Sequence, residues 1–185
     1  MKNLVPLALA ALCLSAQPAL SSDTPAAPQK KIHQEFRSGD DFSGQDLQST
    51  SFFQVRMNGT NFQNANLSAS SFEQCDLAGA DFRGATFSPQ SRIFRVTANE
   101  GNFEGVDFGG IAIDSVNFCD ANLRGAKNFG SVRRANFKKA DLSGADLSAL
   151  KLPLDEVSWD DAIYDSTTIF PKGFDPVASG AVKAK

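Results

Sequence analysis

Large apolar side chains recur at every fifth position through the middle of the chain. The first uninterrupted run comprises Phe42, Leu47, Phe52, Met57, Phe62, Leu67, Phe72, Leu77, Phe82 and Phe87. The frame then slips by one residue near Pro89 and continues through Ile93, Ala98, Phe103, Phe108, Ile113, Phe118 and Leu123. A second fault covers residues 127–131, after which the pattern ends with Val132, Phe137, Leu142, Leu147 and Leu152. A period of five suits neither an α-helix, with 3.6 residues per turn, nor a long strand, whose side chains alternate with a period of two.

The other positions of the five-residue unit are also patterned. A small residue lies two places before the centre, as at Ala80 and Ala140, and Asp or Asn usually lies one place before it. Glycine recurs two places after the centre, for example at Gly44 and Gly84, where a type II turn requires a positive φ. The pattern therefore predicts short extended segments that turn a corner in every unit. One coil of such a chain cannot bury its apolar interior alone, so successive coils must stack around a shared core.

Two stretches carry the most complete units. They are Ala80-Asp81-Phe82-Arg83-Gly84 and Ala140-Asp141-Leu142-Ser143-Gly144, and both resemble the small-Asp/Asn-Leu/Phe-x-x consensus of the pentapeptide-repeat family. The resemblance implies an all-β fold, a right-handed quadrilateral β-helix of about five to six coils in which residues 20 or 21 apart lie above one another. The expected core columns are Phe42, Phe62, Phe82, Phe103 and Leu123, and Leu47, Leu67, Phe87 and Phe108. Phenylalanine, at 16 residues, is thus the expected core filler.

The two ends of the chain suggest a domain organisation. Residues 1–22 combine Lys2, a short apolar stretch and small residues, which is typical of a secretory signal peptide. We predict a disordered linker and N-terminal cap at 23–36, with Ile32 to Phe36 as the cap, and the repeat β-helix at 37–153. A C-terminal cap is expected at 154–176, around Trp159, and a disordered tail at 177–185. The cap could alternatively be the face of an end-to-end homodimer, so the protein is expected to be a monomer or such a dimer.

Few residues point to chemistry, and we predict that the protein is not an enzyme and has no catalytic residues, cofactor or metal. His33 is the only histidine and lies at the edge of the repeat. The recurrent Asp residues belong to the repeat and are interpreted as turn-shaping groups. Cys75 occupies a small inward position, whereas Cys119 points outward about two coils, or roughly 10 Å, away. Because a disulfide requires Cα atoms within roughly 7 Å, we predict no intramolecular disulfide.

One charged feature is not explained by the repeat pattern. A basic cluster around the second fault contains Arg124, Lys127, Arg133, Arg134, Lys138 and Lys139. Such runs are usually a solvated face, and the alternative is a docking patch for an anionic surface, such as polysaccharide, lipid headgroups or an acidic protein. No aromatic residues interleave with exposed positions, which argues against binding of single-stranded nucleic acid.

The sequence thus favours a non-enzymatic exported structural or interaction protein that presents a rigid solenoid surface to a partner protein. The expected location is the periplasm, or the thylakoid lumen if the source is cyanobacterial. Two alternatives are an anionic-surface binder that uses the basic cluster and the family's DNA-mimicking, topoisomerase-protecting activity. The latter needs a strongly negative surface, whereas the formal net charge is only −3. We expect no nucleic-acid partner and no membrane span.

Overall fold

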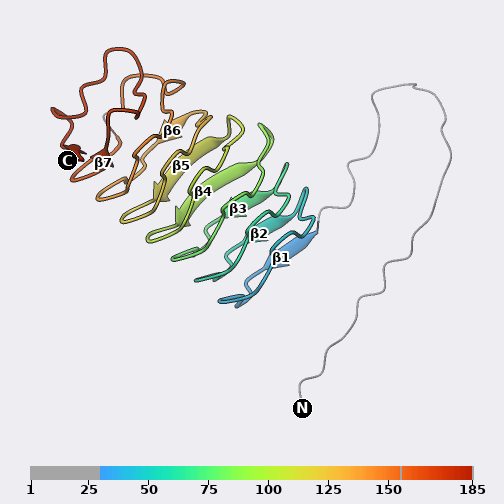
Figure 1. The fold of residues 1–185 in the computed structure, drawn as a ribbon. Coiled ribbons are helices and arrows are strands. Elements are labelled where there is room, and N and C mark those ends of the chain that lie inside the picture. The colour runs from blue at the N-terminus through green and yellow to red at the C-terminus, as the bar shows by residue number, and fades with distance from the viewer. Residues whose placement is uncertain (1–29, 155, 185) are drawn as a thin grey trace, which may run out of the picture.

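The computed structural model describes residues 30–154 and 156–184. The regular elements in this part are the strands β1 (Lys31–His33), β2 (Ser51–Phe53), β3 (Ser71–Glu73), β4 (Arg92–Thr97), β5 (Ala112–Asn117), β6 (Val132–Arg133), β7 (Ile163–Tyr164) and β8 (Val182–Lys183). Strands β1 to β6 form one sheet in chain order, β7 and β8 form a second, and all pairs are parallel. Figure 1 shows the strands stacked in sequence order along one rod. The predicted signal peptide and residues 23–29 lie outside the described residues.

Successive turns of the chain are in register, 20 residues apart in the regular part. Phe52 pairs with Phe72, and the step to Ile93 is one residue longer because the first fault inserts a residue. The step from Ile113 to Val132 is one residue shorter, across the second fault. Isolated parallel bridges join the turns in the same way on three further sides. The fold is therefore a four-sided parallel β-solenoid, as predicted.

We number the four sides in chain order. Side 1 is the sheet of β1 to β6, and sides 2, 3 and 4 are centred on the columns that contain Met57, Phe62 and Leu67. Side 3 carries the longest series of paired positions, which are Asp41, Asn61, Asp81, Asn102, Asn122, Asp141, Ile163 and Val182. The solenoid thus has about eight turns, and the expected five to six is wrong. The count was too low because residues beyond 153 keep stacking after they lose the five-residue pattern.

Phenylalanine columns fill the interior. On side 3 the ring centroids of Phe62 and Phe82 are 4.8 Å apart and those of Phe82 and Phe103 are 4.9 Å apart, with nearly parallel planes. The rings of Phe62 on side 3 and Phe72 on the opposite side 1 meet edge to face across the interior at 5.7 Å. Small residues such as Ala80 fill the corners and are fully buried. Stacked and edge-to-face rings each add about 0.5–1.5 kcal/mol beyond the burial of their area, so the columns stabilise the stacking of turns.

The second fault brings in a core residue that the five-residue frame does not mark. Phe129 is fully buried and its ring lies 4.7 Å from that of Phe108, so it extends the side 4 column. The next residue, Gly130, packs directly on the backbone of the turn below. A Cβ at this position would overlap the carbonyl oxygens of Gly110 and Ile111, so only glycine fits.

The C-terminal segment continues the solenoid. The ring of Trp159 stacks on Phe137 at 4.9 Å, and Phe174 packs against Trp159 at 5.1 Å. These aromatic residues extend the core beyond the last repeat unit, and the cap expected at residues 154–176 stays a prediction. Residues 177–184 differ from the predicted disordered tail, because Val182–Lys183 forms β8 and pairs with β7.

The N-terminal end also differs from the prediction. Ile32 is a buried core residue of β1, which is the first strand of the side 1 sheet and not a separate cap. Phe36 points outward and is 77% exposed, with the guanidinium of Arg56 5.2 Å from its ring centroid. The part of the chain that the structure describes has no helix that could span a bilayer.

Candidate functional site: the outer face of side 1

The basic cluster of the sequence does not form one patch. Arg124 follows Leu123 on side 3 and Lys127 lies on side 4, where it pairs with Asp107 in the ladder. Arg133 and Arg134 belong to side 1, and Lys138 and Lys139 follow Phe137 on side 2. A stretch of 16 residues covers almost one full turn of the solenoid, so its side chains leave the rod on all four sides.

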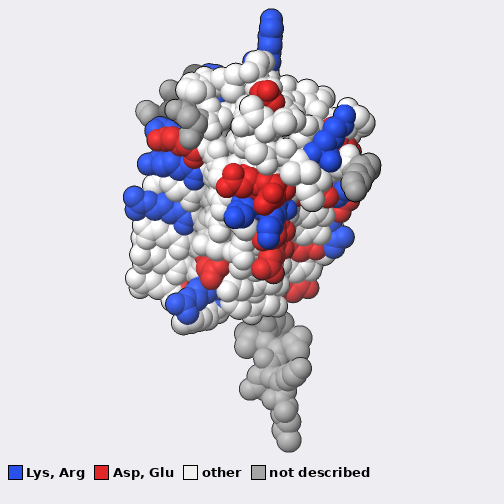
Figure 2. All heavy atoms as spheres, turned by 90° about the vertical axis from the view of Figure 1, so that its left-hand side faces the viewer, with Lys and Arg blue, Asp and Glu red and all other residues white. Residues whose placement is uncertain are grey.

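Half of these cations are neutralised by acids of neighbouring turns. Arg124 contacts Asp141 at 3.0 Å, Lys127 lies 3.9 Å from Asp107, and Arg134 contacts Asp114 at 2.6 Å. Figure 2 shows lysine and arginine lying among aspartate and glutamate on the pictured face, without a broad region of one sign. The geometry therefore does not support one extended basic docking patch.

The outward residues of side 1 form the most distinctive surface. Each strand of the sheet buries its central side chain and directs the residues on either side of it outward. The residues one place after the centre form a column composed of His33, Phe53, Glu73, Phe94, Asp114 and Arg133. Beside it, the side-chain amides of Gln34, Gln54 and Gln74 form a ladder with N–O distances of 3.0 and 2.8 Å.

Aromatic rings and arginines combine on this face. Phe94 is half-buried, and the guanidinium groups of Arg92 and Arg95 lie over its ring, 4.8 and 5.0 Å from the ring centroid. Phe53 lies two turns earlier in the column and contacts the ring of His33 edge to face at 5.7 Å. The expectation that exposed positions lack aromatic residues is therefore wrong for side 1. The five-residue pattern suggested that phenylalanine belongs to the core and did not distinguish these outward rings.

Arginine and aromatic side chains are the residues that most often dominate binding energy at protein interfaces. Cation–π stacking holds the guanidinium groups of Arg92 and Arg95 against a ring, which lowers the entropy lost when a partner orders them. Glu73 lies 3.9 Å from Arg92, so the face offers charges of both signs around Phe94. The outer face of side 1 is thus the candidate interaction surface.

The Asp and Asn residues before the repeat centres shape the turns. Their side-chain oxygens accept hydrogen bonds from the backbone amide two residues later. The amide of Ser43 donates to Asp41 with an N–O distance of 2.9 Å, and the amide of Ser143 donates to Asp141 with an N–O distance of 3.0 Å. This Asx turn repeats around the solenoid, which confirms the turn-shaping interpretation. Within the described residues, no group of three or more His, Cys, Asp or Glu is arranged to hold a metal ion.

The two cysteines of the described chain have different environments. Cys75 is buried on the inner side of the turn, and burial raises the pKa of its thiol to about 11. Cys119 is partly exposed, and its thiol donates a hydrogen bond to the carboxylate of Asp120, which also raises its pKa. Neither environment favours a reactive thiolate at neutral pH. His33 lies on the outer column of side 1 beside Phe53 and not in an enclosed site.

These features define the class of the protein. The described residues contain no helix and wind into a four-sided parallel solenoid with apolar columns inside and Asx turns at its corners. The sequence model of pentapeptide repeats matches eight copies, at residues 60–88 and 131–149. The chain belongs to the pentapeptide-repeat family.

Several solved structures are similar to the chain. A pentapeptide repeat protein of the Arabidopsis thaliana thylakoid lumen is 30% identical, with 66% of this chain and 71% of that protein covered and a TM-score of 0.35. QnrB1, a plasmid-mediated fluoroquinolone resistance protein, is 21% identical, with 85% and 92% covered and a TM-score of 0.43. HetL, a pentapeptide repeat protein involved in heterocyst differentiation regulation in the cyanobacterium Nostoc, is 16% identical, with 82% of each chain covered and a TM-score of 0.30. A search of curated proteins found no match.

Proposed function

We propose that the protein is a non-enzymatic, exported interaction module that binds a partner protein through the outer face of side 1. The observation that carries this proposal is the Phe94 ring with Arg92 and Arg95 stacked on it, in the same outward column as Phe53. These groups lie on a continuous parallel sheet, which presents a rigid surface that loses little conformational entropy on binding.

The distribution of charge argues against the DNA-mimicking alternative. A DNA mimic needs carboxylates free to replace phosphates, whereas here carboxylates are paired with arginines on several turns. Arg83 contacts Asp81 at 2.7 Å, and hydrogen bonds from Arg134 lower the pKa of Asp114. The low net charge of −3 points the same way.

Export is part of the proposal and rests on the first 22 residues of the sequence. An envelope fraction of the native organism is expected to contain a chain that lacks these residues, as checked by mass spectrometry of the N-terminus. Recovery of the protein from the cytosol with residues 1–22 intact would contradict export.

Binding by side 1 is tested by replacing its two outward phenylalanine rings with serine. A Phe53→Ser, Phe94→Ser double variant keeps every core column and is expected to retain the fold. We expect it to capture its partner from the native compartment at least about tenfold less well than the wild type, because such rings are typical interface hot spots. Quantitative mass spectrometry of the captured proteins provides the measurement.

A matched control removes an exposed apolar side chain elsewhere. Ile169 is 52% exposed on side 4, so Ile169→Ser makes a comparable change away from the proposed surface. The control is expected to capture the same proteins as the wild type. Equal capture by the double variant and the control would place the binding surface somewhere other than side 1.

A further inference from the structure

The corner between sides 1 and 2 differs from the other corners of the solenoid. All of its described positions have a positive φ, and they are Gln34, Gln54, Gln74, Arg95, Ser115 and Arg134. The other three corners use glycine in some of their turns, as at Gly59, Gly84 and Gly110. A side chain at a positive φ costs free energy, and costs of this kind cluster at functional positions. This corner thus keeps polar side chains where glycine would suit the backbone better.

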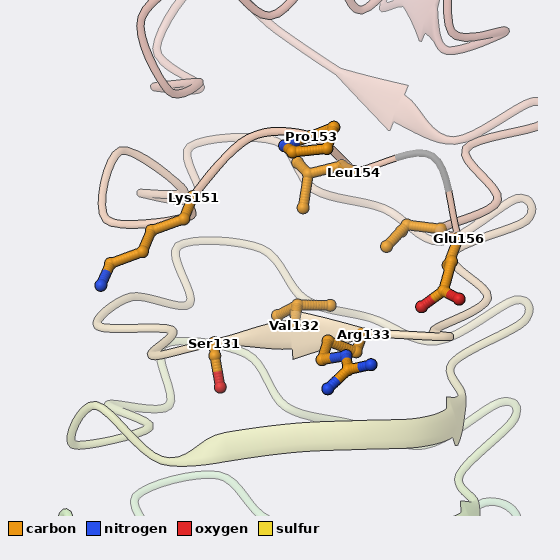
Figure 3. Close-up of a pocket in the computed structure, with 8 residues that line it drawn as sticks. Ser131, Val132, Arg133, Lys151, Pro153, Leu154 and Glu156 are labelled. Atoms are coloured by element: carbon orange, nitrogen blue, oxygen red, sulfur yellow. The ribbon is translucent and has the colours of Figure 1, made fainter.

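A groove runs beside these side chains along the rod. Two hollows of about 310 and 430 Å³ share Arg95 and Thr97 as lining residues, so they continue one another from turn to turn. Their floor consists of buried side chains, which are Val55, Cys75, Val96 and Val116. Figure 3 shows a different hollow, between β6 and Pro153, and its described lining residues do not line this groove.

Polar side chains form both walls of the groove. The corner residues form one wall, and the residues just before the side 2 centres form the other. This second wall comprises Arg56, Asp76, Thr97, Asn117 and Asn136. Amide, hydroxyl and guanidinium groups therefore recur along the groove, one turn after another, at a spacing of about 4.8 Å.

The spacing of the turns favours a polysaccharide over a peptide. An extended peptide advances about 3.3 Å per residue, so its residues do not keep step with turns about 4.8 Å apart. The backbone beside the groove is also already paired, since the amides of Gln54 and Asp76 donate to the carbonyls of Glu73 and Val55, both at 3.0 Å. One hexose unit of an extended polysaccharide spans about one turn, and its hydroxyl groups pair with amide, hydroxyl and guanidinium side chains.

The charges of the groove favour an acidic polymer. Among the described residues that line the first hollow, Arg56 and Arg95 carry two positive charges against the one negative charge of Asp76. In the second hollow, Arg134 is paired with Asp114 at 2.6 Å. Guanidinium groups form strong, charge-assisted hydrogen bonds with carboxylates, which uronic acid units supply.

We propose that the groove binds an extended acidic polysaccharide, with successive sugar units lying over successive turns. The carboxylates of the polymer lie beside Arg56 and Arg95, and its hydroxyl groups bind the amides of Gln54 and Gln74. The proposal goes beyond binding of a partner protein and does not rest on it, although Arg95 belongs to both surfaces.

The proposal is tested with a β-1,4-linked mannuronate hexamer, titrated into the isotope-labelled full-length protein. We expect it to shift the backbone amides of residues 54–56, 74–76 and 95–97 selectively. Two companion ligands are mannohexaose of the same linkage, which lacks carboxylates, and hexaaspartate, which has carboxylates without sugar units. Both are expected to bind at least about tenfold more weakly, because the first loses the charge-assisted hydrogen bonds and the second does not keep step with the turns.

Removal of charge from the protein provides a matched comparison. Arg56→Gln with Arg95→Gln is expected to weaken binding of the mannuronate hexamer about tenfold or more. The fold should be kept, because glutamine already occupies this corner at Gln54 and Gln74. Lys138→Gln with Lys139→Gln removes the same charge outside the groove and is expected to leave binding unchanged.

A glycine variant separates binding from folding. Gln54→Gly with Gln74→Gly relieves two positive φ angles, so it is expected to unfold cooperatively, and it should bind the mannuronate hexamer about fivefold or more weakly because two hydrogen-bonding groups are lost. Absence of binding by the mannuronate hexamer, shifts outside the groove, or a companion ligand that binds as tightly would each overturn the proposal. Unchanged binding by the glycine variant, or equal effects of the arginine and lysine variants, would also overturn it.

Discussion

Phe82 illustrates how one residue holds several turns together. Its side chain is 1% exposed and its ring contacts Phe62, Phe72, Phe87 and Phe103. The contacts reach the turns below and above as well as an adjacent side of the same turn. A substitution here therefore removes stabilisation from three successive turns at once.

A charged residue at this position is expected to unfold the rod. Removing a buried phenylalanine side chain costs about 3–5 kcal/mol, and Phe82→Asp adds the cost of burying a carboxylate. Circular dichroism during heating should show no cooperative transition for this variant, whereas Arg83→Asp, at the adjacent exposed position, should keep one. A soluble Phe82→Asp protein that melts cooperatively would contradict the assigned core.

The cysteines provide a second test at the residue scale. In a Cys13→Ser chain, one thiol is expected to react with a thiol reagent in the native state, because Cys119 is accessible and Cys75 is buried with its pKa raised to about 11. Two thiols should react after unfolding. Detection of no free thiol in the unfolded, unreduced protein would show that the predicted absence of a disulfide is wrong.

At the scale of the structural element, the corner turns carry a recurring conformational cost. The position two places after the centre has a positive φ whether or not it is glycine, as at Ala69, where φ is 56°, and at Glu100, where φ is 58°. Residues with a Cβ are strained in this region. Local sequence preference is thus overridden at these corners by the stacking of turns.

Glycine at such a corner is expected to stabilise the protein. Ala69→Gly relieves about 1–2 kcal/mol of strain and loses about 0.5–1 kcal/mol to the flexibility of glycine in the unfolded chain, so a small net gain remains. Ala78→Gly is the matched control, because Ala78 is a corner residue without a positive φ, and it should lower stability. Urea unfolding gives both values, and a loss of stability in Ala69→Gly would refute the strain argument.

The turn at Asp165 makes the stability of the fold depend on pH. Its carboxylate accepts hydrogen bonds from the hydroxyl and amide of Thr167 and from the amide of Gly144, and these lower its pKa to about 2. Because the folded pKa is below the unfolded value of about 3.9, this group stabilises the fold above pH 4 and the contribution is lost as the pH falls towards 2.

The carboxyl signal of Asp165 in an NMR titration is expected to have its midpoint near pH 2. The Asp165→Asn variant keeps an acceptor without the ionisable group, so it should lose less stability than the wild type between pH 4 and pH 2. A midpoint near 3.9 would show that the turn does not hold the carboxylate.

On the scale of the whole molecule, the last residues close one end of the solenoid. The segment that contains β8 makes three backbone hydrogen bonds to the turn below. The amides of Val182 and Ala184 donate to the carbonyls of Ala162 and Tyr164, both at 2.7 Å, and the carbonyl of Gly180 accepts from the amide of Asp161 at 2.9 Å. The segment thereby covers the edge of β7, which would otherwise be open to pairing with another chain.

Deletion of residues 177–185 is expected to lower stability by about 2–4 kcal/mol, since each of these three hydrogen bonds contributes about 0.5–1.5 kcal/mol. This corresponds to a fall in Tm of about 4–16 °C in scanning calorimetry. The deleted protein should also self-associate in light scattering, through the uncovered edge. Val177→Ser, which keeps the backbone and changes a 68% exposed side chain, should do neither. An unchanged Tm after deletion would mean that β8 does not close the rod.

The five-residue pattern of the chain was enough to predict the repeat, its two faults, the core columns and the turn-shaping role of Asp and Asn. Each of these depends on contacts that recur with a fixed separation, so the period in the chain is also the period in space. Residues outside the period were not predictable in this way. Phe129 enters the core from the second fault, and residues 177–184 add a strand after the pattern has ended.

The positions of the surface residues relative to one another depend on how the turns stack, so the chain pattern did not reveal them. Six cations that are close in sequence leave the rod on four sides because the chain turns a corner every five residues. Conversely, Phe53 and Phe94 are 41 residues apart and share one outward column because the turns stack. Which side chains are neighbours on the surface depends on how the turns stack, whereas the core positions can be recognised within each five-residue unit.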